Sequence, residues 1–540
     1  MSNMSLKWEQ IKQNQWVCLF LLLIIYKIYF IYYFYFLSTG FHPSLLEKLH
    51  LDGFVFHEIY ESDSFILSSL KYVYFIIPIT LLTAFFYFFS KQTSWESIGQ
   101  EFLKPTKYFI LFIVLFTSWF YGFSAYNYYF DRPYYFDRFL ILLLGVLLFR
   151  YTWLLPIFIG IIILWLSQFN FPIGHVSLTD KKIIYEILIL FLGFLTIKSF
   201  FKIKVYVFWI VMFSLIAANY FIPGIGKIQI GPTWYEWMLE NELWVLLRST
   251  FFNHWMSFLD EAQKAQIVGI VKYLNFPMLL FTMIIELFAI FILFRRKFTI
   301  ALLLLFSVFH IGIFLSSGIF FWKWMIFNLA LAIILSLYKQ FFVTLFTKQN
   351  FIISVILVCL SPWLFQPVKL AWWDTRFFEV MQYEVTDMDN NNYILSGNQM
   401  RPYEQFTYQR LDYLVPDSIA IVDNNLTNYD RFYLLKRKKI QDMKEWVKEN
   451  KKITYDEVQV KKLDNFLETY FENYANHLKK NDIYIPKYAT PDHGWTGIAP
   501  ANKFPDDRPI KSFRVKFIQF YPTEEKVCVL NETYIYEKQF

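Results

Sequence analysis

The stretch FPMLLFTMIIELFAIFILFRRKFTIALLLLFSVFHIGIFLSSG, residues 276–318, decides the fold of this chain. It holds two apolar runs, each of about 19 residues, which is the length that crosses roughly 30 Å of hydrocarbon as an α-helix. Arg295, Arg296 and Lys297 separate the two runs, and three consecutive cations belong in water. The pattern therefore predicts two antiparallel membrane-spanning helices joined by a short basic turn.

The composition places the rest of the chain in the same class. Of 540 residues, 56% are hydrophobic and 22% aromatic, above the roughly 45–50% apolar content of soluble domains. Apolar runs of about 15 to 23 residues recur up to Pro367, so we expect ten or eleven spans. The expected spans are 16–37, 70–90, 108–124, 136–149, 152–168, 183–200, 204–222, 276–294, 298–316, 319–338 and 351–366.

The charges in the turns predict how the spans are oriented. With the N-terminus inside, the basic turns all fall on the inner side and the opposite loops are neutral or acidic, as the positive-inside rule requires. The net charge of +7 is therefore explained by topology rather than by nucleic-acid binding. The basic residues are Lys91, Lys104, Lys107, Arg150, Lys198, Lys202, Lys204, Arg295, Arg296, Lys297, Lys339 and Lys348.

We therefore expect an all-α polytopic membrane domain over residues 1–366 and a smaller extracytoplasmic α+β domain over residues 367–540. A sequence rich in Phe, Ile, Tyr, Lys and Asn suggests a bacterial source, and hence the inner membrane. Apolar residues recur at helical spacing from Val458 to Leu478, which predicts an amphipathic helix. Short β-rich runs follow and indicate a small sheet: SFRVKFIQFY, EKVCVL and TYIYEKQF.

The stretch NYFIPGIGKIQIGPTW, residues 219–234, interrupts the seventh apolar run with helix breakers and one cation. Pro223, Gly224 and Gly226 predict that a regular helix stops before Lys227. A lysine in a pocket at this depth is desolvated, which favours the neutral amine and makes it available as a base. The alternative is a lysine that extends to the membrane interface, and periodicity and position alone favour this alternative.

Glu286 and His310 are ionisable residues in the middle of two successive apolar runs. At 1.5 Å per residue they lie about 15 Å and about 9 Å from the outer ends of their spans, so we expect the two side chains to meet. The pair either locks the two helices together or takes part in function. His175, His254 and His493 lack the spacing of metal ligands, so no metal site is expected.

Together these segments resemble the vitamin K-dependent γ-glutamyl carboxylases and their bacterial relatives, the HTTM (horizontally transferred transmembrane) domain proteins. NYFIPGIGKIQIGPTW is similar to the family segment YF…aG…K…W. Residues 276–327 are similar to a pair of spans in which an acidic residue is followed by a basic turn, an FH pair and a GiF element. The resemblance covers residues 15–340 in order of elements, and the tail of helix and strands is similar to that family's extracytoplasmic part.

The resemblance implies that Lys227 deprotonates a reduced, vitamin K-like hydroquinone. It also implies that four residues bind the ligand: Glu286, His310, Arg138 and Trp234. In that chemistry a γ-proton of glutamate is removed and CO2 is added, so a peptide or protein substrate at the outer face is implied. One loop, FDRPYYFDRFLIL, departs from the family and has Arg138 in place of a histidine. A guanidinium group stays protonated and cannot act as a base, which puts glutamate carboxylation itself in doubt.

Two functions remain. The first is a membrane enzyme that uses Lys227 as a base, with a reduced quinone as cosubstrate. The second is a non-catalytic membrane protein that binds or moves a lipid or other hydrophobic ligand, or scaffolds a complex. Arg138 and the lack of another catalytic cluster in the sequence favour the second. A secondary transporter is less favoured, because the sequence lacks paired halves with interrupted helices.

Overall fold

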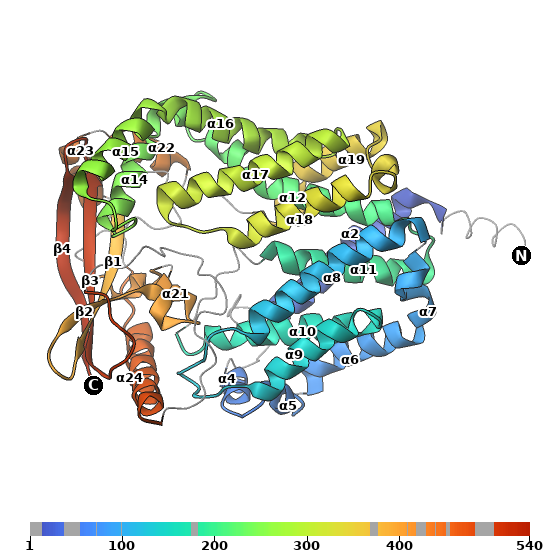
Figure 1. The fold of residues 1–540 in the computed structure, drawn as a ribbon, viewed down its shortest axis with the longest axis horizontal. Helices are drawn as coiled ribbons and strands as arrows, with labels where there is room; N and C mark the ends of the chain where they lie inside the picture. Colours follow the sequence, from blue (N-terminus) through green and yellow to red (C-terminus); the bar gives the residue numbers. More distant parts are fainter. Residues whose placement is uncertain are drawn as a thin grey trace, which may run out of the picture.

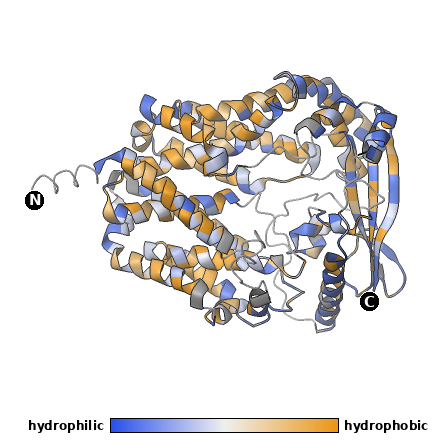
Figure 2. Cartoon of the chain, turned by 180° about the vertical axis from the view of Figure 1, so that it is seen from behind, coloured by the Kyte–Doolittle hydropathy of each residue, from blue (hydrophilic) through white to orange (hydrophobic). Residues whose placement is uncertain are grey.

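The computed structural model describes residues 13–36, 54–71, 73–98, 100–173, 182–367, 376–407, 409–416, 428–437, 439–449, 454–480 and 502–540. In Figure 1 the apolar helices lie alongside one another, and a small sheet stands at one end of them. Figure 2 shows that these helices are mainly hydrophobic, whereas the sheet mixes hydrophobic and hydrophilic residues. The mostly helical fold with a small C-terminal sheet was predicted from the sequence.

Each of the eleven predicted spans overlaps a helix. The helices are α2 (Gln15–Ile31), α6 (Val73–Phe88), α8 (Gln100–Gly122), α9 (Tyr135–Leu147), α10 (Leu155–Ser167), α11 (Lys182–Phe200), α12 (Val205–Ile228), α16 (Asn275–Phe288), α17 (Arg296–Ser317), α18 (Trp322–Leu337) and α19 (Lys348–Cys359). In the described ranges, α2, α11, α12 and α17 are long and apolar enough to cross a membrane. Helix α15 (Glu261–Tyr273) and α16 form a fifth candidate, bent by 61°. The other crossings stay predictions, since those helices are shorter or less apolar.

Helices α11 and α12 form the centre of the helical part. Most residues of both are buried, as expected of helices that are hydrophobic all round. Helix α17 lies further out and exposes one side, with Leu304, Val308, Ile311 and Leu315 each more than a third exposed. Their spacing of four, three and four residues places these side chains on one face of the helix.

Shorter helices either connect the long ones or belong to the C-terminal part of the chain. They are α4 (Phe54–Tyr60), α5 (Phe65–Ser69), α7 (Ser90–Thr93), α13 (Glu236–Glu240), α14 (Leu243–Phe252), α20 (Ser361–Leu364), α21 (Glu404–Thr407), α22 (Asn428–Lys436) and α23 (Ile440–Glu449). Helix α7 lies at the end of the helical part opposite the sheet (Figure 1). This position agrees with the predicted placement of Lys91 on the side away from the C-terminal domain.

The C-terminal sheet has four antiparallel strands in the order β2-β1-β3-β4. The strands are β1 (Phe378–Asp387), β2 (Asn392–Leu395), β3 (Ile510–Pro522) and β4 (Val527–Gln539). The sequence predicts EKVCVL and TYIYEKQF as two strands, but both belong to the single strand β4. Irregularities in the register between β3 and β4 absorb the extra residues and leave the strand continuous.

The two sides of the sheet pack against different parts of the chain. The predicted amphipathic helix is α24 (Glu457–Lys480), and its Leu463, Phe466 and Phe471 pack with Phe513 and Val515 of β3. On the other side, apolar residues of α14 and α15 pack against β1 and β3. These residues are Trp244, Val245, Leu247, Phe251 and Val268 on the helices and Phe378, Val380, Ile518 and Phe520 on the strands.

Candidate functional site

Lys227 lies in the last turn of α12, which runs without interruption over Val205–Ile228. The prediction that Pro223, Gly224 and Gly226 stop the helix before this lysine is therefore wrong. In an exposed helix, proline costs about 3 kcal/mol and glycine about 1 kcal/mol relative to alanine. Helix α12 is instead buried and packs against α16 and α19. This tertiary packing outweighs the local preference.

Gly224 has a packing role. A Cβ atom at this position would lie 3.0 Å from the Cβ of Glu286 and 3.5 Å from the carbonyl carbon of the same residue. Side chains rarely approach so closely, so glycine is what allows α12 to lie this near to α16. Lys227 follows Gly224 by three residues and lies on the same face of α12. The close approach therefore brings the lysine beside Glu286.

Lys227 and Glu286 form a buried ion pair. The Nζ atom of Lys227 lies 2.9 Å from each carboxylate oxygen of Glu286, and the two residues are 7% and 3% exposed. Trp237 of α13 covers the ammonium group, with Nζ 5.1 Å from the ring centroid, a distance at which an indole ring attracts a cation. Lys227 is thus buried and paired rather than extended to a surface.

This pair is costly to break. Each charge loses several kcal/mol of hydration on burial, and the attraction between the charges offsets that loss only while both are present. Base chemistry requires a neutral amine at Lys227. The hydrogen bond of 2.9 Å from Nζ to a carboxylate oxygen of Glu286 places a proton acceptor directly beside this amine.

A second polar group lies two turns earlier on the same face of α12. The hydroxyl oxygen of Tyr220 accepts a hydrogen bond from Asn328 Nδ2 of α18 and is hydrogen-bonded to His310 Nε2 of α17, both at 2.9 Å. The Tyr220 ring stacks on Phe306, with 3.6 Å between the ring centroids. Tyr220, His310 and Asn328 are all buried. Sequence reasoning missed Tyr220, although its spacing of seven residues from Lys227 is a helical signal.

The sequence also predicts that Glu286 and His310 meet between antiparallel helices. The structure places Glu286 against Lys227 and His310 against Tyr220. Both residues therefore contact the same face of α12, while a direct contact between them stays a prediction. Helix α12 is the element that joins the two predicted ligand-binding positions, and sequence reasoning did not assign it this role.

Arg138 of α9 folds the loop that precedes its own helix. Its Nε donates to the carbonyl of Pro133 at 2.7 Å, Nη1 to those of Ser124 at 2.7 Å and Gly122 at 3.2 Å, and Nη2 to that of Ala125 at 3.2 Å. The guanidinium group also lies over the ring of Trp165. A ligand at Arg138 would have to compete with these carbonyl groups, so the geometry gives Arg138 a structural role.

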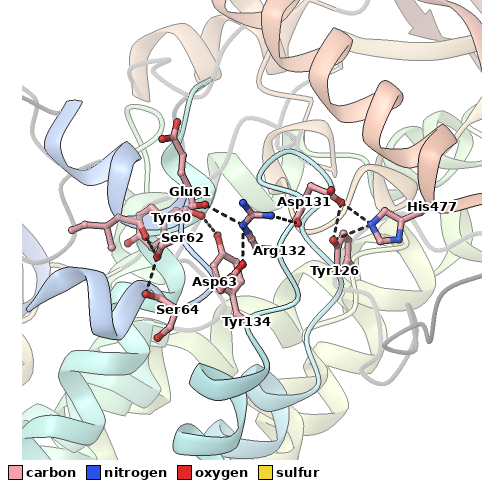
Figure 3. A network of polar contacts seen from close by, with 11 residues as sticks. Tyr60, Glu61, Ser62, Asp63, Ser64, Tyr126, Asp131, Arg132, Tyr134 and His477 are labelled. Atoms are coloured by element: carbon pink, nitrogen blue, oxygen red, sulfur yellow. Dashed lines mark hydrogen bonds and ion pairs between the residues drawn. The ribbon is translucent and has the colours of Figure 1, made fainter. Parts of the chain in front are cut away.

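Figure 3 shows that the same loop joins three parts of the chain. Arg132 donates to the carbonyl of Glu61 at 3.0 Å, and its Nε lies 3.3 Å from Asp63 Oδ1, next to α4 and α5. Asp131 Oδ1 lies 2.6 Å from His477 Nε2 of α24 and accepts a hydrogen bond from Tyr126 at 2.8 Å. Burial and this bond raise the pKa of Tyr126 above its usual range. Asp131 thus links this loop to the C-terminal domain through His477, and Arg132 holds the same loop to the helical part.

Trp237, rather than the predicted Trp234, is the tryptophan beside Lys227. Trp234 is 60% exposed and packs with its neighbour Tyr235. Leu435 of α22 belongs to the same apolar cluster as Trp237, and Lys436 Nζ lies 3.4 Å from Glu236 Oε2 on α13. The C-terminal domain therefore covers the segment that in turn covers Lys227. Sequence patterns do not indicate this contact, because α22 and α13 lie far apart along the chain.

Sequence reasoning also missed the buried carboxyl group of Glu186. Glu186 of α11 is 1% exposed, and its Oε1 accepts a hydrogen bond from the Tyr26 hydroxyl at 2.9 Å. Lys182 Nζ lies 3.6 Å from the same oxygen and donates to the carbonyl of Phe365 at 2.9 Å. This cluster ties α2, α11 and the end of α20 together, and it provides a structural counterpart to the Lys227–Glu286 pair.

No three His, Cys, Asp or Glu side chains gather as a metal site would require, as far as the described ranges extend. His175 and His493 lie outside those ranges. Comparison of the chain with protein-family models, curated proteins and solved structures gives no match. Function is therefore inferred from the geometry around α12 and from the resemblance in the sequence.

Proposed function

We propose that the chain is an integral membrane protein whose helical part, residues 1–366, spans the bilayer. Long apolar helices and the exposed apolar face of α17 support this proposal. The basic turns and the position of α7 support placing the C-terminal domain on the extracytoplasmic side of a bacterial inner membrane. The lipid bilayer is then the principal partner of the protein.

Within this protein, we propose that the Lys227 region holds a small hydrophobic ligand of the quinol class. One observation carries the proposal, namely the buried Lys227–Glu286 pair beneath Trp237. The indole Nε1 of Trp237 is buried and has no hydrogen-bond partner within the described residues, although buried indole N–H groups usually find one. An oxygen on a ligand ring would satisfy this donor. A hydroquinone supplies such oxygens together with a weakly acidic O–H group.

The proposed role of Lys227 is to accept a proton from that O–H group. Once Nζ has passed one proton to Glu286, the neutral amine can accept the ligand proton, which leaves an ammonium group on Lys227 and the first proton on Glu286. The new positive charge then faces the ligand oxygen and stabilises the charge that develops there. The family resemblance implies that the substrate of this reaction is a peptide or protein, which the outer domain would bind.

The test compares wild type, Lys227→Met and a matched control, Lys182→Met, which removes the lysine that pairs with the buried Glu186. Each protein is purified in mild detergent, its bound quinones are identified by mass spectrometry, and turnover of a reduced naphthoquinone is measured. We expect turnover by wild type and Lys182→Met, and its loss in Lys227→Met. Equal turnover by all three proteins would overturn the catalytic proposal.

The second candidate is a non-catalytic protein that binds or moves a lipid or scaffolds a complex. Two observations favour it: Lys227 and Glu286 already satisfy each other, and Arg138 is engaged with the backbone of its own loop. In this case the Lys227–Glu286 pair serves only to hold α12 against α16. Finding the same co-purifying lipids in wild type and Lys227→Met, with no quinone and no turnover in either, would favour this second function.

A further inference from the structure

Helix α15 lies between the sheet and the outer end of α16. Its buried side carries Val268, with Ile267 and Val271 partly buried, and packs against Phe520 of β3. It begins with a capping box at Asp260 and ends where the chain bends by 61° into α16. The helix is thus held firmly on its inner side.

The opposite, exposed face of α15 changes character along its length. Gln266 is exposed near its middle, whereas Ile270 is 52% and Tyr273 is 87% exposed near its end. These residues follow one another at intervals of four and three, so they lie on one face. That face passes from polar to apolar in the direction of α16.

The apolar end of this face continues into an apolar face of α16. Phe276, Phe281, Ile284 and Phe288 of α16 are each between 40% and 48% exposed. If α16 crosses the bilayer, as proposed above, these residues face lipid. The exposed end of α15 adjoins them directly, since Tyr273 is separated from α16 only by Leu274.

We propose that α15 lies at the outer surface of the bilayer, with its carboxyl end immersed in lipid and its amino end in water. The inference rests on the proposed membrane function and goes beyond it, because it assigns a lipid surface as the partner of a helix that does not itself cross. Amphipathic helices of this kind lie about 5–10 Å deep at the boundary of head groups and acyl chains, and tyrosine is enriched at that depth.

This placement would also orient the C-terminal domain. Lys272 Nζ on α15 lies 2.6 Å from Glu524 Oε2 in the turn between β3 and β4. The same helix therefore contacts lipid on one side and holds the sheet on the other. The bilayer surface would then set the height of the sheet above the membrane.

The test measures lipid exposure with nitroxide spin labels on the full-length protein in phosphatidylcholine and phosphatidylglycerol vesicles. Labels are attached in the variants Gln266→Cys, Ile270→Cys, Tyr273→Cys and Ile284→Cys, after the accessible native cysteines are replaced by serine. Oxygen, which concentrates in lipid, and a water-soluble nickel chelate serve as collision probes. We expect the ratio of oxygen to nickel collisions to be severalfold higher at Ile270 and Tyr273 than at Gln266.

The label at Ile284 on α16 separates the two proposals. High oxygen access at Ile284 with water-like values at Ile270 and Tyr273 would overturn the interfacial placement and leave the membrane proposal intact. Low oxygen access at Ile284 would overturn the membrane proposal itself. Immobile labels shielded from both probes at Ile270 and Tyr273 would show that a protein covers this face, which also overturns the inference.

Discussion

At the scale of single residues, the Lys227–Glu286 pair makes a prediction about stability. Replacing Lys227 with methionine leaves a buried carboxylate without its ammonium group, and we expect a loss of about 3–5 kcal/mol. The double variant Lys227→Met/Glu286→Leu removes both charges and should recover most of that loss. Denaturant unfolding in detergent measures both effects. Additive losses in the double variant would contradict the pairing as described.

Asp387 at the end of β1 is a second residue with a specific electrostatic role. Its Oδ1 accepts hydrogen bonds from the backbone N–H groups of Asp389 at 2.9 Å and Asn391 at 2.8 Å. Its Oδ2 accepts from the Asn391 side chain at 3.0 Å and from Arg508 at 3.3 Å. Burial alone would raise the pKa of Asp387, but these hydrogen bonds lower it to about 2.

The lowered pKa predicts how acid affects the C-terminal domain. An unfolded aspartate has a pKa of about 3.9, so the ionised Asp387 stabilises the fold above about pH 4, and this contribution is lost as the pH falls toward about 2. Asp387→Asn should therefore lower the Tm at neutral pH and flatten its decline in acid. Thermal unfolding across this pH range checks the prediction. Parallel Tm profiles for wild type and variant would refute it.

At the scale of elements, the contact between α12 and α16 depends on Gly224. A methyl group there would meet Glu286 at 3.0 Å, so we expect Gly224→Ala to cost about 1–3 kcal/mol through overpacking. Gly312 in α17 is the matched control, because a Cβ atom there meets nothing within 4 Å. Gly312→Ala should be neutral or gain about 0.5–1 kcal/mol. Equal Tm shifts in the two variants would show that the close approach is unimportant.

The elements also show how far sequence reasoning reaches. The length of the apolar runs predicts the long helices, because a run such as 298–316 is compatible with few structures other than a helix. The helical spacing of apolar residues predicts α24. The prediction that a helix ends before Lys227 was wrong because helix propensity depends only on local sequence. The contact of Gly224 with Glu286 joins segments that are distant in the sequence. Trp237 and Tyr220 were missed for the same reason, since their partners come from other helices. Strand β1 was missed, although apolar and polar residues alternate along most of FEVMQYEV, residues 378–385.

At the scale of the whole molecule, α24 and the loop around Asp131 join the two parts of the chain. We expect His477→Ala to release this contact, because the variant removes the partner of Asp131 at 2.6 Å and of Tyr126 at 2.9 Å. Hydrogen exchange of the loop should rise severalfold. Lys461→Ala is the control, since Lys461 lies on the exposed surface of α24. Unchanged exchange in His477→Ala would contradict the proposed joint.

The cover that α22 places over Trp237 has a consequence for biosynthesis. Leu435 and Phe432, which pack in that cover, leave the ribosome long after Lys227, at a synthesis rate of about 5–20 residues per second. Until the C-terminal domain has folded, the apolar surface around Trp237 is open to whatever is nearby. A hydrophobic ligand could therefore bind near Trp237 while the chain is still being made. The C-terminal domain, which is synthesised last, would then cover the bound ligand.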